Sequence, residues 1–392
     1  MRVDLVTKEY PPEIYGGAGV HVAELVRALR NDIEVVVHAF GARRSEADTR
    51  SYATPASLST ANAALQTLAV DVEIASQVGG DLVHSHTWYA NAAGRLAQLL
   101  LDIPHVVTAH SLEPLRPWKA EQLGGGYRLS SAIEREAYET ANAIIAVSDG
   151  MRRDILRSYP LLEEDRVHTI RNGIDLDRWR PRSDPELLAS LGIDTDRPTV
   201  TFVGRITRQK GLPYLLEAAR RLPLDVQLVL CAGAPDTPEI LAEVRTGVAD
   251  LLAERTGVVW IEDHLPVEAL SAVLTASTVF VCPSVYEPLG IVNLEAMACE
   301  VAVVGTATGG IPEVIDDGVT GRLVPIEQAQ DGTGTPIDPE RFIDDFAATL
   351  VEVLADPDAA HAMGRAGRAR AEDEFSWSAI ADATRALYTS LL

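Results

Sequence analysis

Short apolar runs alternate with longer segments of helical period along this chain, and that alternation limits the fold more than any other feature. Runs rich in Val and Ile predict buried strands, whereas the longer segments carry apolar residues at a 3.6-residue period. Strands and helices in this rhythm predict a parallel sheet that is covered on both faces. We therefore expect an α/β protein. An all-β architecture is excluded, because hairpin patterns and Asn-Gly turns do not dominate.

The pattern runs through the chain twice, which predicts two doubly wound domains of similar size. In the first half the predicted strands are Val3–Thr7, Ile33–Phe40, Asp81–His86, His105–His110, Ala143–Ser148 and Val167–Arg171. The rhythm restarts near residue 199, with strands at Thr199–Val203, Val226–Cys231, Val258–Ile261, Thr278–Pro283, Val301–Gly305 and Gly321–Val324. Predicted helices include Val20–Leu29, Ser130–Ala141, Leu212–Arg221, Glu239–Glu254, Val267–Thr275, Gly290–Cys299, Glu340–Leu354 and Trp377–Leu392.

These elements place an N-terminal Rossmann-like domain at residues 1–171 and a C-terminal one at 172–375, followed by a final helix at 376–392. The polar, proline-containing stretch 172–198 is the predicted linker, and 328–336 is a predicted loop insertion. Ligands of doubly wound sheets bind beyond the carboxyl ends of the strands. Candidate functional residues are therefore sought in the loops that follow strands.

Charge and cysteine content exclude several classes of protein. The chain has 34 Lys and Arg residues against 57 Asp and Glu, a net charge of −23, which disfavours nucleic acid and anionic membrane surfaces as partners. Three widely spaced cysteines without a CxxC pair argue against a disulfide framework and a zinc site, and favour a reducing compartment. The sequence has no signal-peptide pattern or membrane-spanning run, so we expect a cytoplasmic protein.

Two loops after predicted strands carry features of anion binding. Gly16 and Gly17 precede a predicted helix, where backbone N–H groups and the helix dipole favour a negative charge. The loop Gly204–Gly211 concentrates the cations Arg205, Arg208 and Lys210 in an acidic protein, and Arg with Lys suits a diphosphate. The alternatives are a tight turn without a ligand and a solvated basic loop.

A third segment pairs two glutamates across the start of a predicted helix. Glu287 precedes the helix, and Glu295 lies inside it among apolar residues, where a carboxylate is costly to bury without partners. Vicinal hydroxyls of a polyhydroxylated ligand are suitable partners, and the free N–H groups of Leu289, Gly290 and Ile291 belong to the same loop. The alternative is a glutamate paired with an internal arginine.

Together with Thr108-Ala109-His110, these motifs resemble retaining glycosyltransferases of the two-Rossmann GT-B type, in the same order and over essentially the whole chain. The segments Thr7–Pro12 and His110–Lys119 resemble more narrowly the actinobacterial glycogen synthases, a GT4-like group now regarded as α-maltose-1-phosphate synthases. The resemblance implies two domains facing a cleft, a last helix that crosses back to the first domain, and transfer of glucose from ADP-glucose. It implies glucose 1-phosphate or α-glucan ends as acceptor and no metal cofactor.

The resemblance also implies roles for particular residues. The catalytic group is His110, Glu287, Arg205 and Lys210. The donor contacts are Gly16, Gly17, Arg205, Lys210, Leu289, Gly290, Ile291 and Glu295, and the acceptor contacts are Glu9, Arg116, Lys119 and Arg128. One departure stands out, because starch-type synthases carry Lys two residues before the glycine pair where this chain has Ile14.

Several alternatives stay open at this stage. The acceptor cations beside Gly124–Gly126 favour a sugar phosphate, whereas aromatic residues nearby (Trp88, Tyr89, Trp118 and Tyr127) suit a neutral glucan. Other enzymes of the same fold, such as mannosyl or inositol glycoside transferases and epimerase-type enzymes, remain competitors, as does a sugar-binding protein without catalysis. The sequence does not decide between a monomer and a homodimer.

Overall fold

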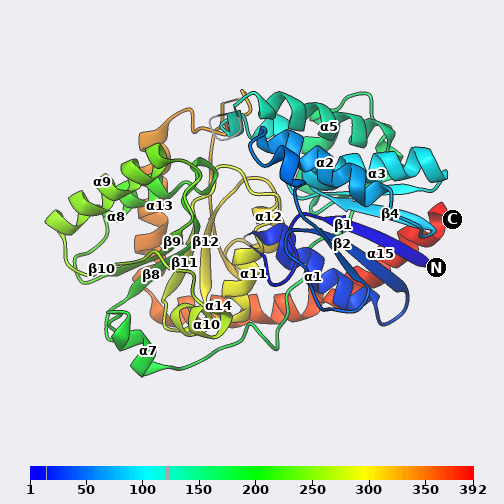
Figure 1. Cartoon of the computed structure of the whole chain (residues 1–392). Helices are drawn as coiled ribbons and strands as arrows, with labels where there is room; N and C mark the ends of the chain where they lie inside the picture. The colour runs from blue at the N-terminus through cyan, green and yellow to red at the C-terminus, as the bar shows by residue number, and fades with distance from the viewer. Residues whose placement is uncertain (15, 121–123, 330) are drawn as a thin grey trace. The chain divides into compact units, whose positions relative to one another are not determined.

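The computed structural model describes residues 1–14, 16–120, 124–329 and 331–392, and the chain divides into two compact units. Unit 1 contains Met1–Gly173 together with Trp377–Leu392, and unit 2 contains Ile174–Ser376 (Figure 1). The last helix, α15 (Trp377–Leu391), thus belongs to unit 1 and contacts α1 (Gly17–Leu29) there. In the described part of the chain, no helix is both long enough and apolar enough to span a membrane.

Unit 1 is built on a parallel sheet whose described strands follow the order β3-β2-β1-β4-β5-β6-β7. The strands are β1 (Arg2–Thr7), β2 (Glu34–Phe40), β3 (Thr49–Tyr52), β4 (Leu82–His86), β5 (His105–Ala109), β6 (Ala143–Ala146) and β7 (Val167–Thr169). The order reverses between β1 and β4, which pair directly from Val3–Leu82 to Thr7–His86. The carboxyl ends of β1, β4 and β5 therefore lie together at one edge of the sheet.

Helices cover both faces of this sheet because side chains alternate along each strand. Val3 and Leu5 of β1 pack into the core that α1 and α15 close, whereas Val6 packs into the core on the side of α2 (Ala63–Ala75) and α3 (Trp88–Leu101). The other helices among the described residues of unit 1 are α5 (Gly126–Thr140), α6 (Asp149–Ser158) and the 3₁₀ turns η1 (Ala56–Leu58), η2 (Glu113–Leu115) and η3 (Glu164–Arg166).

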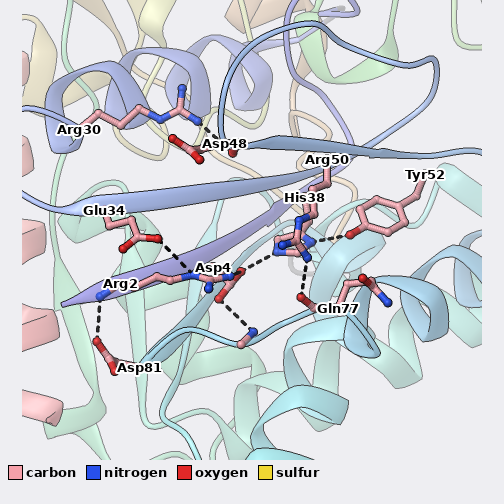
Figure 2. A network of polar contacts seen from close by, with 11 residues as sticks. Arg2, Asp4, Arg30, Glu34, His38, Asp48, Arg50, Tyr52, Gln77 and Asp81 are labelled. Atoms are coloured by element: carbon pink, nitrogen blue, oxygen red, sulfur yellow. Dashed lines mark hydrogen bonds and ion pairs between the residues drawn. The ribbon is translucent and has the colours of Figure 1, made fainter.

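Strand β3 at the sheet edge was missing from the sequence prediction. Its residues Thr-Arg-Ser-Tyr have no apolar run, so the period gave no signal. Register with β2 and a buried polar chain hold it in place: the Tyr52 hydroxyl lies 2.8 Å from Nδ1 of His38, whose Nε2 lies 2.7 Å from Asp4 (Figure 2). Burial opposes the charge on Asp4, but the contact with His38 outweighs it and lowers the pKa of Asp4.

Unit 2 repeats the same architecture with a parallel sheet in the order β10-β9-β8-β11-β12-β13. Its strands are β8 (Thr199–Arg205), β9 (Gln227–Gly233), β10 (Val258–Ile261), β11 (Val279–Cys282), β12 (Ala302–Thr306) and β13 (Gly321–Val324). Its helices are α7 (Pro185–Ser190), η4 (Arg208–Lys210), α8 (Leu212–Ala219), α9 (Pro238–Glu254), α10 (Val267–Thr275), α11 (Ile291–Ala298), α12 (Ile311–Val314), α13 (Pro339–Leu354) and α14 (Pro357–Glu374).

The two faces of this sheet are again covered by different helices. Leu228 and Leu230 of β9 join the core that α8, α9 and α13 close, and Val229 between them joins the core with α7 and α10. The sheet order reverses between β8 and β11, so the loops that follow these two strands are neighbours. The α/β class and the two doubly wound sheets predicted from the sequence are confirmed.

One part of the predicted organisation needs correction. The stretch 172–198 is not an open linker, because it contains α7 and the buried Trp179, and all but its first two residues belong to unit 2. Leu188 and Ile193 in this stretch are buried against Val229 and Val273. The polar residues that suggested a linker lie on the exposed side of this segment, whose apolar residues pack on the sheet.

Candidate active site

In unit 2, the loops after β8 and β11 are joined at the point where the strand order reverses. The backbone N–H of Val285 donates to the carbonyl of Gln209 at 2.9 Å, which ties the two loops together. Gly211 caps η4 with a φ of 65°, and a β-carbon there would overlap the carbonyl oxygen of Pro283. The close approach of the two loops therefore requires glycine at this position.

This approach brings together two of the predicted catalytic residues, Lys210 and Glu287. Nζ of Lys210 lies 2.6 Å from Oε2 of Glu287, and the Ser284 hydroxyl donates to the same oxygen at 3.1 Å. The Lys210 side chain is 21% exposed and that of Glu287 is 8% exposed, so the pair is largely shielded from water. Burial works to lower the pKa of Lys210, but the Glu287 carboxylate outweighs it and raises this pKa. The lysine therefore stays charged.

Helix α11 begins directly after this pair. Gly290 precedes it with a φ of 93°, and the first N–H groups of any α-helix have no partner within the helix. Leu289 and Gly290 are buried and Ile291 is half-buried, so the predicted donor amides lie beside Glu287 in the chain. Asn293 is fully buried, and its side-chain oxygen and nitrogen have no hydrogen-bond partner among the described residues.

Glu295 lies on the second turn of α11. Burial raises the pKa of its carboxyl to about 7, against the opposing charges of Lys210 and Arg178. The sequence left open that Glu295 pairs with an internal arginine. Arg178 does lower the pKa of Glu295, but burial has the larger effect, and the pKa stays above its usual value.

The two arginines of the basic loop have different environments. Arg205 ends β8, and its guanidinium lies 2.5 Å from Asp236. Arg208 is about half exposed and faces Glu243 at 3.7 Å. Arg205 is thus oriented by a carboxylate at the strand end, whereas Arg208 contributes to the surface.

In unit 1, the predicted catalytic residue His110 follows β5. It lies beside two further histidines, His86 and His21, that the sequence did not indicate as candidates. Nε2 of His110 is 3.0 Å from Nδ1 of His86 at the end of β4, and its ring centroid is 4.7 Å from that of His21 on α1. Burial lowers the pKa of His110 and His86 well below the usual value and that of His21 to about 4, so all three rings are neutral. Their separation in sequence offered no local pattern that could have revealed this group.

The predicted glycine loop of unit 1 is closed over Glu9. The N–H of Gly16 donates to Oε2 of Glu9 at 2.8 Å, and α1 begins at the next residue, Gly17, which is exposed. A β-carbon on Gly19 would lie too close to Glu9 and Ile14. Glu9, predicted to contact the acceptor, is 8% exposed and also organises this turn.

Two lysines face aromatic rings in this part of unit 1, and Arg116 acts on one of them. Nζ of Lys8 lies 3.7 Å from the centroid of the Tyr89 ring, and Nζ of Lys119 lies 5.8 Å from those of Tyr89 and Trp88. Burial and then Arg116 lower the pKa of Lys119; burial lowers the pKa of Lys8 to about 8, and Lys119 contributes in the same direction. We call Lys8, Arg116, Lys119, Trp88 and Tyr89 the basic–aromatic cluster.

The remaining acceptor predictions have the following environments. Nζ of Lys119 forms a 2.6 Å ion pair with the buried Glu113, and Arg116 donates to the Ser111 hydroxyl at 3.1 Å. Arg128 is exposed on α5 and makes no hydrogen bond or ion pair with the described residues. Cation Lys8 belongs to the cluster although it was not among the predicted acceptor residues.

Comparison with known proteins assigns the chain to a family. Residues 15–178 match the model described as Glycosyltransferase Family 4, and residues 183–370 match Glycosyl transferases group 1. The chain is 55% identical over 392 residues to an alpha-maltose-1-phosphate synthase from Mycolicibacterium smegmatis, covering 99% of both chains. It is 32% identical to a D-inositol 3-phosphate glycosyltransferase from Mycobacterium avium over 79% of this chain and 69% of that protein.

A solved structure shows the same fold at low sequence identity. Anabaena Alr3699/HepE, solved in complex with UDP and glucose, superimposes with a TM-score of 0.76 at 20% identity and covers both chains completely. The GT-B fold predicted from the motifs is thereby confirmed. The chain belongs to the GT-B glycosyltransferases, in the family that includes the mycobacterial α-maltose-1-phosphate synthases.

Proposed function

We propose that this chain transfers the glucosyl unit of ADP-glucose to glucose 1-phosphate with retention of configuration, which yields α-maltose 1-phosphate and ADP. The observation that carries the proposal is the Lys210–Glu287 pair at the β8/β11 reversal of unit 2, beside the start of α11. A charged lysine held at that place suits a departing diphosphate. The 55% identity to a synthase of that name over the full length supports the choice of substrates.

The donor is assigned to unit 2. Lys210 and Arg205 compensate the negative charge that grows on the diphosphate, and Glu295 accepts hydrogen bonds from the ribose hydroxyls. Glu287 and the amides of Leu289–Ile291 hold the glucose and the β-phosphate. In the same proposal, charge compensation by these side chains makes a divalent cation unnecessary for transfer.

The acceptor is assigned to the basic–aromatic cluster of unit 1. Lys119 lowers the pKa of Lys8, and Arg116 lowers that of Lys119, so an anion among these three cations would be favourable. Glucose 1-phosphate supplies that anion together with a sugar face for Tyr89 or Trp88, whereas a neutral glucan end supplies only the sugar. The cluster therefore favours the sugar phosphate over the glucan.

The chemical step follows from these assignments. The bond between the anomeric carbon of glucose and the diphosphate oxygen breaks as a bond to the acceptor hydroxyl forms on the same face. The proton of that hydroxyl passes to the departing phosphate oxygen, and the proposal keeps for His110 the role beside the reacting sugar that the family resemblance implies. A covalent intermediate on Glu287 is disfavoured, because Lys210 and Ser284 both donate to its Oε2.

The reaction itself is tested by product analysis. ADP-glucose with glucose 1-phosphate should release ADP and give a phosphorylated disaccharide faster than ADP-glucose with glycogen gives chain extension. Pretreatment with EDTA should not lower this rate. UDP-glucose, GDP-mannose and inositol phosphate serve as competing substrates, and faster turnover of any of them would replace the proposal. ADP release without a disaccharide would also contradict it.

Donor binding should depend on pH through Glu295. With a pKa of about 7, this carboxyl is protonated below neutral pH and then loses its ability to accept from the ribose hydroxyls. We expect the KM for ADP-glucose to rise about tenfold as pH falls from about 8 to about 6. Glu295→Gln should raise KM at all pH values and flatten this profile. The exposed Glu268→Gln on α10 is the matched control and should retain it.

A further inference from the structure

Unit 1 contains a group of buried imidazoles whose composition goes beyond what glycosyl transfer requires. His21 is on α1, His86 ends β4, and His110 follows β5. One ring nitrogen from each of the three lies within 4.8 Å of the other two. His21 is 2% exposed and His86 is fully buried, whereas His110 is half-buried and opens the group toward solvent.

The nitrogen atoms of this group are poorly satisfied by protein partners. Among the described residues, Nε2 of His86 has no hydrogen-bond partner, and the His21 ring nitrogens have only a loose contact with the Asn172 side chain. Buried polar atoms of this kind are rare in folded proteins, because an unmade hydrogen bond costs about 1–3 kcal/mol. The one bond inside the group joins Nδ1 of His86 to Nε2 of His110 at 3.0 Å.

The chemistry of the group suits a cation better than an anion or a sugar. Neutral imidazoles offer lone pairs without charge, and they are the commonest metal ligands in proteins. In a tetrahedral zinc site with bonds of about 2.0 Å, the nitrogens lie about 3.3 Å apart. One nitrogen of each ring already lies within 4.8 Å of the other two, and zinc binding would draw these atoms closer to that spacing. Three histidines then leave a fourth position for water at the solvent-facing side.

We infer that His21, His86 and His110 form a site for Zn²⁺ in unit 1 and that its occupation blocks the enzyme. Three nitrogen–zinc bonds form through ring lone pairs, and the His86–His110 hydrogen bond is lost. The site is inhibitory rather than required, which agrees with transfer that needs no divalent cation. The binding step stands on the geometry alone, whereas the block rests on the role proposed for His110.

Residues around the group give it a defined shape. The ring of His84 lies 4.2 Å from that of His86, and His84 is itself fixed by bonds to the Tyr388 hydroxyl (2.6 Å) and Thr108 (2.7 Å). The Trp377 ring packs edge-on against His21 at 5.4 Å. Helix α15 thus contacts His21 directly and reaches His86 through His84, and such outer contacts orient metal ligands.

The inference is tested by calorimetric titration of the full chain with ZnCl₂ after EDTA treatment and desalting. We expect one zinc ion per chain and a rise in the melting temperature with zinc concentration. His21→Phe keeps a ring at this position, loses only the loose contact with Asn172, and should fold. The His21→Phe variant should bind zinc more weakly by a factor larger than the ~10–100-fold that a change outside the ligand shell costs. His110→Asn is the second variant, and its zinc affinity should fall by a similar factor.

His264→Ala is the matched control. This histidine is exposed in unit 2, so its removal measures how much zinc is bound by surface histidines. It should bind zinc like the unmodified chain. Absence of binding in the unmodified chain, or equal binding in both His21→Phe and His110→Asn, would overturn the site. Zinc should also stop ADP release from ADP-glucose, and EDTA should restore it. One-to-one binding that leaves the rate unchanged would preserve the site and contradict the role of His110 in transfer.

Discussion

Replacing Lys210 with alanine should lower kcat about 10²–10³-fold, which corresponds to roughly 3–4 kcal/mol of transition-state stabilisation. The lysine is charged and already positioned, since Glu287 holds its Nζ at 2.6 Å and raises its pKa. Charge on the departing diphosphate grows only as the bond to glucose breaks. The loss should therefore appear in kcat more than in the KM for ADP-glucose. Initial-rate measurements of ADP release separate the two parameters.

Arg208→Ala is the control for this experiment. Arg208 belongs to the same short loop, but its side chain is about half exposed and faces Glu243 on the surface. Its removal changes the charge of the loop by the same amount and should leave kcat within about twofold. Melting temperatures of both variants show whether the loop still folds. An unchanged kcat for a folded Lys210→Ala variant means that the diphosphate is held elsewhere.

Gly309→Ala should lower kcat about 10²-fold although residue 309 carries no reacting group. Gly309 lies after β12 with a φ of 57°, and a β-carbon there would overlap the carbonyl oxygen of Glu287. The neighbouring Gly310 N–H donates to that same carbonyl at 2.9 Å. The extra methyl forces these two backbone segments apart, and we expect this to disturb the contact of Glu287 with Lys210. A displacement of about 1 Å at a positioned group is enough for a loss of this size.

Gly192→Ala separates crowding from backbone strain. Gly192 also has a positive φ of 77°, but nothing lies within 4 Å of the position where its β-carbon would be. Both variants should lose ~1–2 kcal/mol of stability from the left-handed conformation. Only Gly309→Ala should lose activity, and a crystal structure should show Glu287 displaced. Equal kcat values for the two variants would show that the contact with Glu287 does not position the site.

Much of the fold was predictable because it depends on local patterns. Runs such as Val226–Cys231 and the period of Glu340–Leu354 identify strands and helices within a residue or two of β9 and α13. The order of alternation then implies parallel sheets. Strand β3 escaped prediction because three of its four residues are polar and only Tyr52 is buried. Pairing with β2 and the hydrogen bonds that link Tyr52, His38 and Asp4 position this strand.

Within the site, the sequence determined which loops carry chemistry, since both Lys210 and Glu287 follow predicted strands, and parallel strands end at a common edge. Only the tertiary structure decided that these side chains, 77 residues apart, meet in one ion pair. The same holds for the three histidines on separate elements and for Tyr388, which reaches His84 across 304 residues. The physical reason is the distance along the chain over which each effect acts. The hydrophobic period is a relation between residues close in sequence. Contacts between distant residues depend instead on strand order, register and rotamers, which the packed core sets.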